Sequence, residues 1–112
     1  MTYSFGDVVL VQFPFSSNIG SKKRPAVIIS NDDFNSQRND MVLLAITSQV
    51  NKLTTGEALI KDWQRAGLLK PSAFKSVIFT IEKKFIDKVI GKLITTDRNV
   101  LNNCIKQIIQ NS

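Results

Sequence analysis

The sequence predicts a mainly β protein with α: a small, mostly antiparallel β barrel or sandwich closed by a C-terminal amphipathic helix. Three observations lead to this fold class. Short runs rich in Val, Ile and Leu alternate with polar loops containing Gly, Pro, Asn and Ser. Only the end of the chain has apolar residues at three- and four-residue spacing. A chain of 112 residues has the length of one domain, so we expect residues 1–112 to form a single domain.

The first two strands are predicted on either side of a polar loop. Gly6–Phe13 is a short Val-rich run, and its Gly and Pro boundaries are typical of a buried strand. Pro14–Lys23 contains Pro, Ser, Asn and Gly and ends in two lysines, which indicates a loop. Arg24–Asn31 is the second predicted strand, because Pro25 stands near its start, where a missing amide donor does least harm.

The middle of the chain continues this alternation. Asp32–Asp40 is polar, and we expect a turn of helix there. Met41–Ser48 is predicted as a third buried strand, and Gln49–Gly56 as another polar loop. Glu57–Asp62 is predicted as a strand on the outside of the sheet.

The last part of the chain contains a β-rich run and then the helix. Leu68–Glu82 includes Pro71 and the run AFKSVIFTIE, which predicts one or two strands. From Thr96 onward, apolar residues recur on one face of a predicted helix, with Thr96 as its N-cap and Asp97 suited to the helix dipole. The apolar positions are Val100, Leu101, Cys104, Ile105, Ile108 and Ile109.

The composition narrows the possible chemistry. The chain has no histidine and one cysteine, which excludes intramolecular disulfides, Ser-His-Asp and Cys-His catalysis, and histidine-dependent zinc sites. Cys104 lies on the apolar helix face, so we expect it to be a core residue. The acidic residues are scattered, and we therefore expect neither a metal site nor a cofactor.

Charge and hydropathy indicate the compartment and the kind of partner. The net charge is +6 and the isoelectric point about 9.7, and a basic surface attracts polyanions such as nucleic acid. Charge alone does not decide between this function and simple solubility. No stretch reaches the ~20 apolar residues of a membrane span, and the N-terminus MTYSFGD lacks a signal-peptide pattern. We therefore expect a cytoplasmic protein with no membrane partner.

Two junctions between predicted strands and loops carry candidate phosphate-binding residues. Lys22, Lys23 and Arg24 are adjacent, and an Arg fork beside two lysines suits a phosphate. Thr47, Ser48 and Gln49 follow a buried strand and offer hydroxyl and amide donors. Each junction also has a purely structural interpretation. The first can be a solvated basic turn, and the second can cap the backbone at a strand end.

Taken in order, these motifs resemble the MazF/PemK-like toxins of bacterial toxin–antitoxin systems. The resemblance rests on GDVVLVQF, then KRPAVIISN, then a strand ending in AITSQ. It continues through Trp63, LLKPS, TIEK and IGKL, and so spans essentially the whole chain.

The resemblance implies a small SH3-like or CcdB-like β barrel that forms homodimers. It also implies metal-independent cleavage of single-stranded RNA at short sequences, by attack of the 2′-hydroxyl, to give 2′,3′-cyclic phosphate and 5′-hydroxyl ends. The expected partners are an acidic cognate antitoxin and, only together with it, operator DNA. The family's key arginine matches Arg24 and its key threonine matches Thr47. Base selectivity in the family resides in the loops that match Pro14–Lys23 and Gln49–Gly56.

The site predicted in this way consists of two catalytic and five RNA-binding residues. Arg24 would stabilise the charged phosphorane and pass a proton to the leaving oxygen, and Thr47 would hold a phosphate oxygen. The predicted RNA-binding residues are Lys22, Lys23, Ser48, Gln49 and Lys75.

Many relatives carry an Arg-x-Asp motif where this chain has Ser72 to Phe74, with Lys75 as the nearest cation. That departure leaves the general base open among Glu57, Glu82 and Asp40. Two other functions also stay open: a toxin that binds a protein such as gyrase, and a basic DNA-associated module.

Two further features favour structural interpretations. Trp63 is the only tryptophan and is expected to be part of the core rather than a stacking platform for a base. Lys83, Lys84 and Lys88 are expected to form a solvated face.

Overall fold

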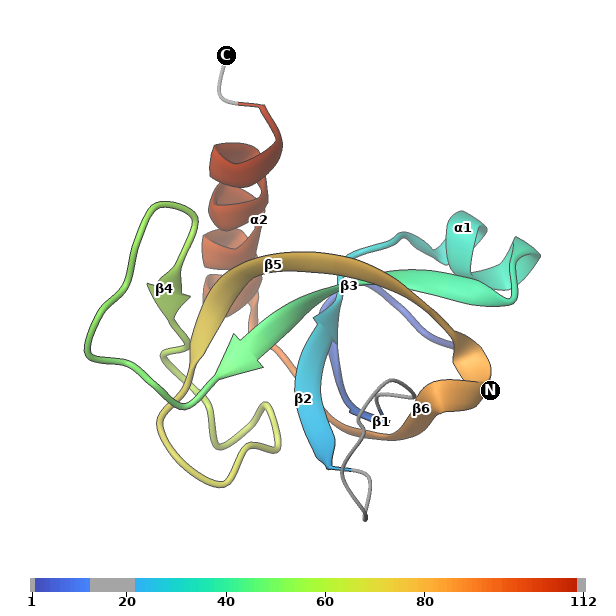
Figure 1. The fold of residues 1–112 in the computed structure, drawn as a ribbon, viewed down its shortest axis with the longest axis horizontal. Coiled ribbons are helices and arrows are strands. Elements are labelled where there is room, and N and C mark those ends of the chain that lie inside the picture. The colour runs from blue at the N-terminus through green and yellow to red at the C-terminus, as the bar shows by residue number, and fades with distance from the viewer. Residues whose placement is uncertain (1, 13–21, 111–112) are drawn as a thin grey trace.

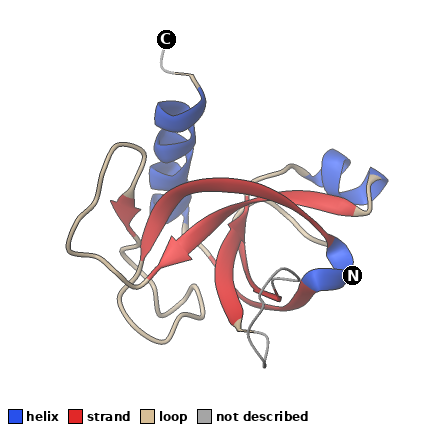
Figure 2. Cartoon of the chain, in the orientation of Figure 1, coloured by secondary structure: helices blue, strands red, loops and turns tan. Residues whose placement is uncertain are grey.

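The computed structural model describes residues 2–12 and 22–110, which form one curled antiparallel sheet with a helix against it (Figures 1 and 2). The six strands are hydrogen-bonded in the order β4-β5-β3-β2-β1-β6. The predicted class, mainly β with a C-terminal helix, is confirmed. The strands are β1 (Asp7–Gln12), β2 (Lys23–Ile28), β3 (Asp40–Thr47), β4 (Ala58–Leu59), β5 (Ala73–Glu82) and β6 (Ile86–Lys92). The helices are α1 (Asp32–Gln37), the 3-10 turn η1 (Lys83–Phe85) and α2 (Thr95–Ile109).

The sheet curls like a barrel but does not close into one, and the predicted class agrees with this arrangement. Figure 1 shows β5 arching over β3, and η1 leads directly from β5 into β6. β4 and β6 are nevertheless the two edges, and no ladder between the described strands joins them. β1, β2 and β3 each begin one residue from the predicted start. β1 and β3 end one residue before the predicted end, and β2 ends three residues before it. The predicted end at Phe13 and most of the Pro14–Lys23 loop lie outside the described residues.

The predicted edge strand at Glu57–Asp62 is much shorter than expected. Only Ala58 and Leu59 pair with β5. The backbone N–H groups of Lys61 and Asp62 donate instead to the carboxylate of Asp97, at 2.8 and 2.9 Å. Because a buried side chain takes these two donors, the chain leaves the sheet after two residues.

The sequence did not predict β6, in a stretch whose lysines were assigned to a solvated face. β6 pairs with β1, but the register shifts twice, between Val8 and Val9 and between Leu10 and Val11. These irregularities remove the two-residue alternation by which an amphipathic strand is recognised.

Apolar side chains form one cluster on each face of the sheet. The first cluster contains Phe74, Leu101 and Cys104 and lies under α2, and the second contains Met41 and Leu43 and lies within the curl of the sheet. The prediction that Cys104 is a core residue is confirmed. Burial, together with the negative charge of Glu57, raises the pKa of its thiol, which disfavours the thiolate.

The start of α2 differs from the prediction. The helix begins at Thr95 rather than after Thr96, its N-cap is Ile94, and no side chain caps it. Asp97 is completely buried and binds the Lys61–Asp62 backbone, so the interpretation of Asp97 as a residue that suits the helix dipole was incomplete. Within residues 2–12 and 22–110, no helix is long and apolar enough to cross a membrane.

Candidate nucleic-acid interface

An open pocket of about 1140 Å³ lies where β2 begins and β3 ends. Its described lining comes from four strands, β1, β2, β3 and β6, and from two loops, which follow β3 and precede β5. The lining residues are Leu10, Lys22–Pro25, Ile46–Gln49, Gly67–Lys70, Ser72 and Lys88–Ile90.

The pocket brings together the two junctions singled out in the sequence. Arg24 lies opposite Val11 in the β1–β2 ladder, and the β2–β3 ladder pairs Ala26 with Ala45. The ladder ends at that pair, and Arg24 and Thr47 lie two residues beyond it on their own strands, where both line the pocket. Six of the seven predicted site residues line the pocket: Lys22, Lys23, Arg24, Thr47, Ser48 and Gln49.

Thr47 ends β3 and its hydroxyl has a fixed position. Its Oγ1 accepts a hydrogen bond from the backbone N–H of Gln49 at 3.1 Å. This is the strand-end capping that the structural interpretation predicted. A hydroxyl that accepts one hydrogen bond still has its own proton to donate, so the capped Thr47 keeps a donor for an anion.

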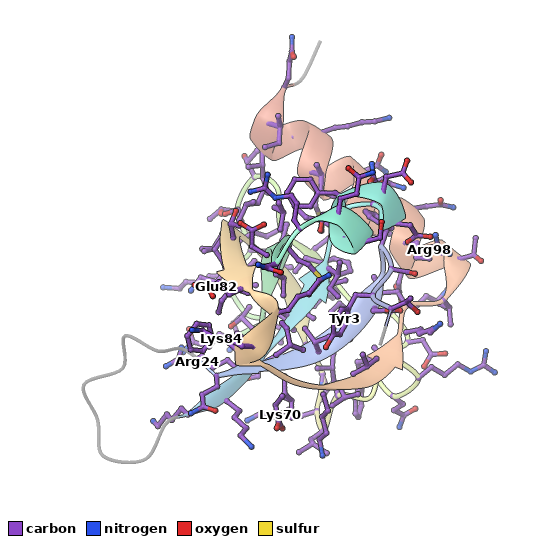
Figure 3. All side chains as sticks on the ribbon, turned by 90° about the vertical axis from the view of Figure 1, so that its right-hand side faces the viewer. Tyr3, Arg24, Lys70, Glu82, Lys84 and Arg98 are labelled. Carbon is purple, nitrogen blue, oxygen red and sulfur yellow. The ribbon has the colours of Figure 1, made fainter. Side chains whose placement is uncertain are left out.

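The pocket is strongly basic. Five of its described lining residues are cations, Lys22, Lys23, Arg24, Lys70 and Lys88, and none is Asp or Glu. Lys23 forms an ion pair with Asp87 at 3.2 Å. Arg24, Lys70 and Lys88 form no ion pair with any Asp or Glu of the described chain. Figure 3 shows Arg24 and Lys70 in the lower part of the molecule in that view.

Two of these cations were not predicted as site residues. Lys88 was assigned to a solvated face, but the β1–β6 register pairs it with Leu10 at the pocket. Lys70 follows Leu68 and Leu69 in a loop whose position only the tertiary structure sets. Leu69 and Lys70 were visible in the sequence as part of the LLKPS motif, which carried the family resemblance but no role.

Lys75, the seventh predicted residue, does not line the pocket. The β3–β5 register places three residues of β5, Lys75–Val77, against Ala45 alone. Lys75 is exposed, and the Ser76 N–H, which the bulge leaves without a partner strand, donates to Glu57 at 3.0 Å. Trp63 is half-buried and packs against the first cluster, as its structural interpretation predicted.

None of the three candidate bases lines the pocket. Asp40 and Glu82 are paired in the ladder at the far end of β3, about 23 Å from Thr47 at ~3.3 Å per residue. Glu57 accepts hydrogen bonds from the N–H groups of Ser76 and Thr54 and from the Ser76 hydroxyl. These bonds lower its pKa to about 2 and tie the carboxylate to the backbone. In the part of the chain that the structure describes, no three Cys, Asp or Glu side chains form a group that could hold a metal ion.

A pocket with five cations, three hydroxyl residues and no acidic lining residue among those described has the chemistry that attracts a polyanion. The fold and the site therefore define a small, mainly β protein with a basic pocket at one end of its β2–β3 strand pair. A family model described as the PemK-like, MazF-like toxin of type II toxin–antitoxin systems matches residues 4–109. The chain belongs to that family. No curated protein sequence matches it.

Solved structures share the fold at low sequence identity. A mycobacterial endoribonuclease in complex with its cognate antitoxin is 16% identical, with a TM-score of 0.78 over 97% of this chain and 96% of the other. A MazF toxin of Mycobacterium tuberculosis is 20% identical, with a TM-score of 0.77 over 95% and 98%. A MazE–MazF complex from Deinococcus radiodurans is 11% identical, with a TM-score of 0.79 over the whole of both chains. These likenesses support the fold and the curled sheet described above.

Proposed function

We propose that the protein is a metal-independent endoribonuclease that cleaves single-stranded RNA at short sequences. The observation that carries the proposal is the presence of Arg24, from the start of β2, and Thr47, from the end of β3, in one pocket whose described lining is rich in cations and free of acids. Family membership and the endoribonuclease relatives support the same activity.

The chemistry requires little from the protein, because the RNA supplies the nucleophile. The 2′-oxygen attacks the adjacent phosphorus and loses its proton to solvent. The bond to the 5′-oxygen then breaks, and that oxygen takes up a proton. The products are a 2′,3′-cyclic phosphate and a 5′-hydroxyl end. The phosphorane carries extra negative charge, which Arg24 neutralises while Thr47 donates to a phosphate oxygen.

The remaining cations fit an extended substrate rather than a single phosphate. Lys22, Lys23 and Lys88 line the same pocket as Arg24 and Thr47, and Ser48 and Gln49 add polar groups to it. A volume near 1140 Å³ exceeds that of most small-ligand pockets, which are ~300–1000 Å³. This arrangement favours several nucleotides of a flexible strand.

The same charge suits the proposed protein partner. An acidic antitoxin segment placed over the pocket would neutralise its cations and block RNA entry. Relatives of the same fold include proteins in complex with a cognate antitoxin and a MazE–MazF complex. We propose in addition that the chain works as a cytoplasmic homodimer and binds operator DNA only with its antitoxin.

The test is cleavage of a single-stranded RNA pool by purified protein in EDTA, followed by analysis of the new ends. The proposal predicts cleavage with cyclic-phosphate and 5′-hydroxyl ends. A requirement for added magnesium, or 5′-phosphate ends, would contradict the mechanism. Failure to cut any RNA, combined with binding to gyrase or to duplex DNA, would favour the non-nuclease alternatives.

A further inference from the structure

One wall of the pocket is a closed loop, Lys61–Pro71, that the mechanism above does not use. Its neck is fastened by a hydrogen bond from the Ile60 N–H to the Ser72 carbonyl at 2.9 Å. Loops of this length with joined ends are compact units packed by their own side chains. Three of its residues, Gly67, Leu68 and Leu69, line the pocket together with Lys70.

The loop is pressed against β6 with no room for side chains between the two backbones. A Cβ on Gly67 would lie 2.0 Å from the Ile90 carbonyl oxygen, and a Cβ on Gly91 would lie 2.4 Å from the Ala66 carbonyl carbon. Gly67 also has φ +81°, which disfavours other residues. The two glycines therefore set the distance between the loop and β6.

A buried carboxylate fastens the other side of the loop. Asp97 in α2 is completely buried, and its Oδ1 and Oδ2 accept from the N–H groups of Lys61 and Asp62 at 2.8 and 2.9 Å. Those are the first two residues of the loop. A carboxylate that accepts from two backbone N–H groups holds the start of the loop in position and orientation more firmly than a neutral acceptor would.

The C-terminal end of the loop, close to its neck, presents a cation with a fixed backbone. The Ser72 hydroxyl donates to the carbonyl of Lys70 at 2.9 Å. The Lys70 side chain is exposed at the pocket, forms no ion pair with a described acid, and follows Leu69, which is 97% exposed. A rigid support for an unpaired cation is what a phosphate contact needs, because the protein then loses little freedom on binding.

We propose that Lys70 contacts an RNA phosphate next to the cleaved one, and that Asp97 is the positioning residue that holds it there. This inference rests on the proposed ribonuclease function. Lys70 stabilises the substrate and the transition state equally, so it lowers KM and leaves kcat unchanged. Asp97 acts only through the Lys61–Pro71 loop.

The first test measures the salt dependence of RNA binding. The probe is a 2′-O-methyl oligonucleotide of the sequence that the wild-type protein cleaves, since it lacks the nucleophile. Each phosphate contact to a single strand contributes ~0.7 to the slope of log Kd against log salt. Lys70→Gln should lower that slope by ~0.7 and weaken binding about fivefold at 0.1 M salt, with kcat for RNA unchanged. Lys106→Gln removes an exposed lysine of α2 that does not line the pocket, and should change neither.

The second test is a double-mutant cycle between Lys70 and the Asp97 anchor of the loop. Asp97→Asn keeps the size of the side chain but loses one acceptor, so it should raise KM about as much as Lys70→Gln does. The double variant should be no worse than Lys70→Gln alone. Ser72→Ala, which removes the hydrogen bond to the Lys70 carbonyl, should act in the same direction and gives the same cycle if Asp97→Asn does not fold.

The outcomes separate the two proposals. If the wild-type protein neither binds nor cleaves RNA, the ribonuclease function fails and all variants are alike. If the wild-type protein is active but Lys70→Gln leaves the salt slope unchanged, Lys70 is not a phosphate contact. If the effects of Lys70→Gln and the anchor variants add independently, Asp97 does not act through Lys70.

Discussion

The charged side chains near the two ends of β3 differ in whether they have ion-pair partners. At the Asp40 end, Arg38 forms a two-point contact with Asp40 at 2.7 and 3.2 Å, and Lys84 lies 3.7 Å from Glu82. Figure 3 shows Glu82 and Lys84 on neighbouring parts of the chain. At the Thr47 end, Arg24, Lys70 and Lys88 meet no described acid within ion-pair distance.

Charges that pair with each other stabilise the fold, whereas unpaired cations are available to bind a ligand. The Arg38 guanidinium holds the pKa of Asp40 below its usual range, so the pair at that end stays ionised and satisfied. The cations at the other end repel one another until an anion arrives. A ligand that supplies phosphates therefore gains more at the Thr47 end than at the Asp40 end, where Arg38 and Lys84 already have acidic partners.

The largest predicted effect distinguishes the two arginines. Arg24→Ala should lower kcat for RNA cleavage ~100- to 1000-fold, because it removes the charge opposite the phosphorane. Arg38→Ala should leave cleavage at the wild-type rate, since it removes a charge that Asp40 already balances. Single-turnover cleavage, with melting temperatures to verify folding, measures both. Equal loss in the two variants would mean that the comparison between the two ends has no catalytic meaning.

The next effect concerns the hydroxyl of Thr47. Thr47→Val has nearly the same shape and lacks the donor, so kcat should fall on the order of 100-fold. Thr47→Ser keeps the hydroxyl and should retain most of the activity. If Val and Ser variants cleave RNA equally well, the hydroxyl serves only to cap β3 through the Gln49 N–H.

A smaller effect concerns Glu57, which lies outside the pocket. Its pKa is lowered to about 2 from 4.5 by hydrogen bonds from Ser76 and Thr54. A carboxylate with a lowered pKa stabilises the folded state above its unfolded pKa and loses that contribution as the pH falls through its folded pKa. Wild-type stability should therefore include a component that disappears between about pH 4.5 and pH 2.

Glu57→Gln should lack that component and should cleave RNA at the wild-type rate at neutral pH. Denaturant unfolding at a series of pH values measures the first effect, and the cleavage assay measures the second. A large loss of cleavage in Glu57→Gln, with the fold intact, would make Glu57 the general base after all.

The sequence predicts the parts of this molecule that depend on local pattern. β1, β2, β3 and α2 follow from apolar runs and from one helical stripe, and the Arg24 and Thr47 junctions lie where those strands start and end. Their meeting in one pocket requires the antiparallel β2–β3 ladder, which the fold class already implies.

The features that the sequence did not predict depend on irregular or long-range contacts. β6 was missed because two register shifts break its alternation, and Lys88 was missed with it. Lys75 lies in the bulge at Lys75–Val77 and does not line the pocket. Asp97 reaches a backbone turn 35 residues away in the chain, a contact that no local pattern contains.

The most direct test of the comparison is to map where RNA binds along β3. Backbone amide chemical shifts would be recorded during titration with the 2′-O-methyl oligonucleotide at low salt. We predict shifts concentrated at residues 22–24, 47–49 and 69–70, and none beyond background at 38–40 or 82–84. Shifts centred on the Asp40 end, or spread evenly over the surface, would contradict the account.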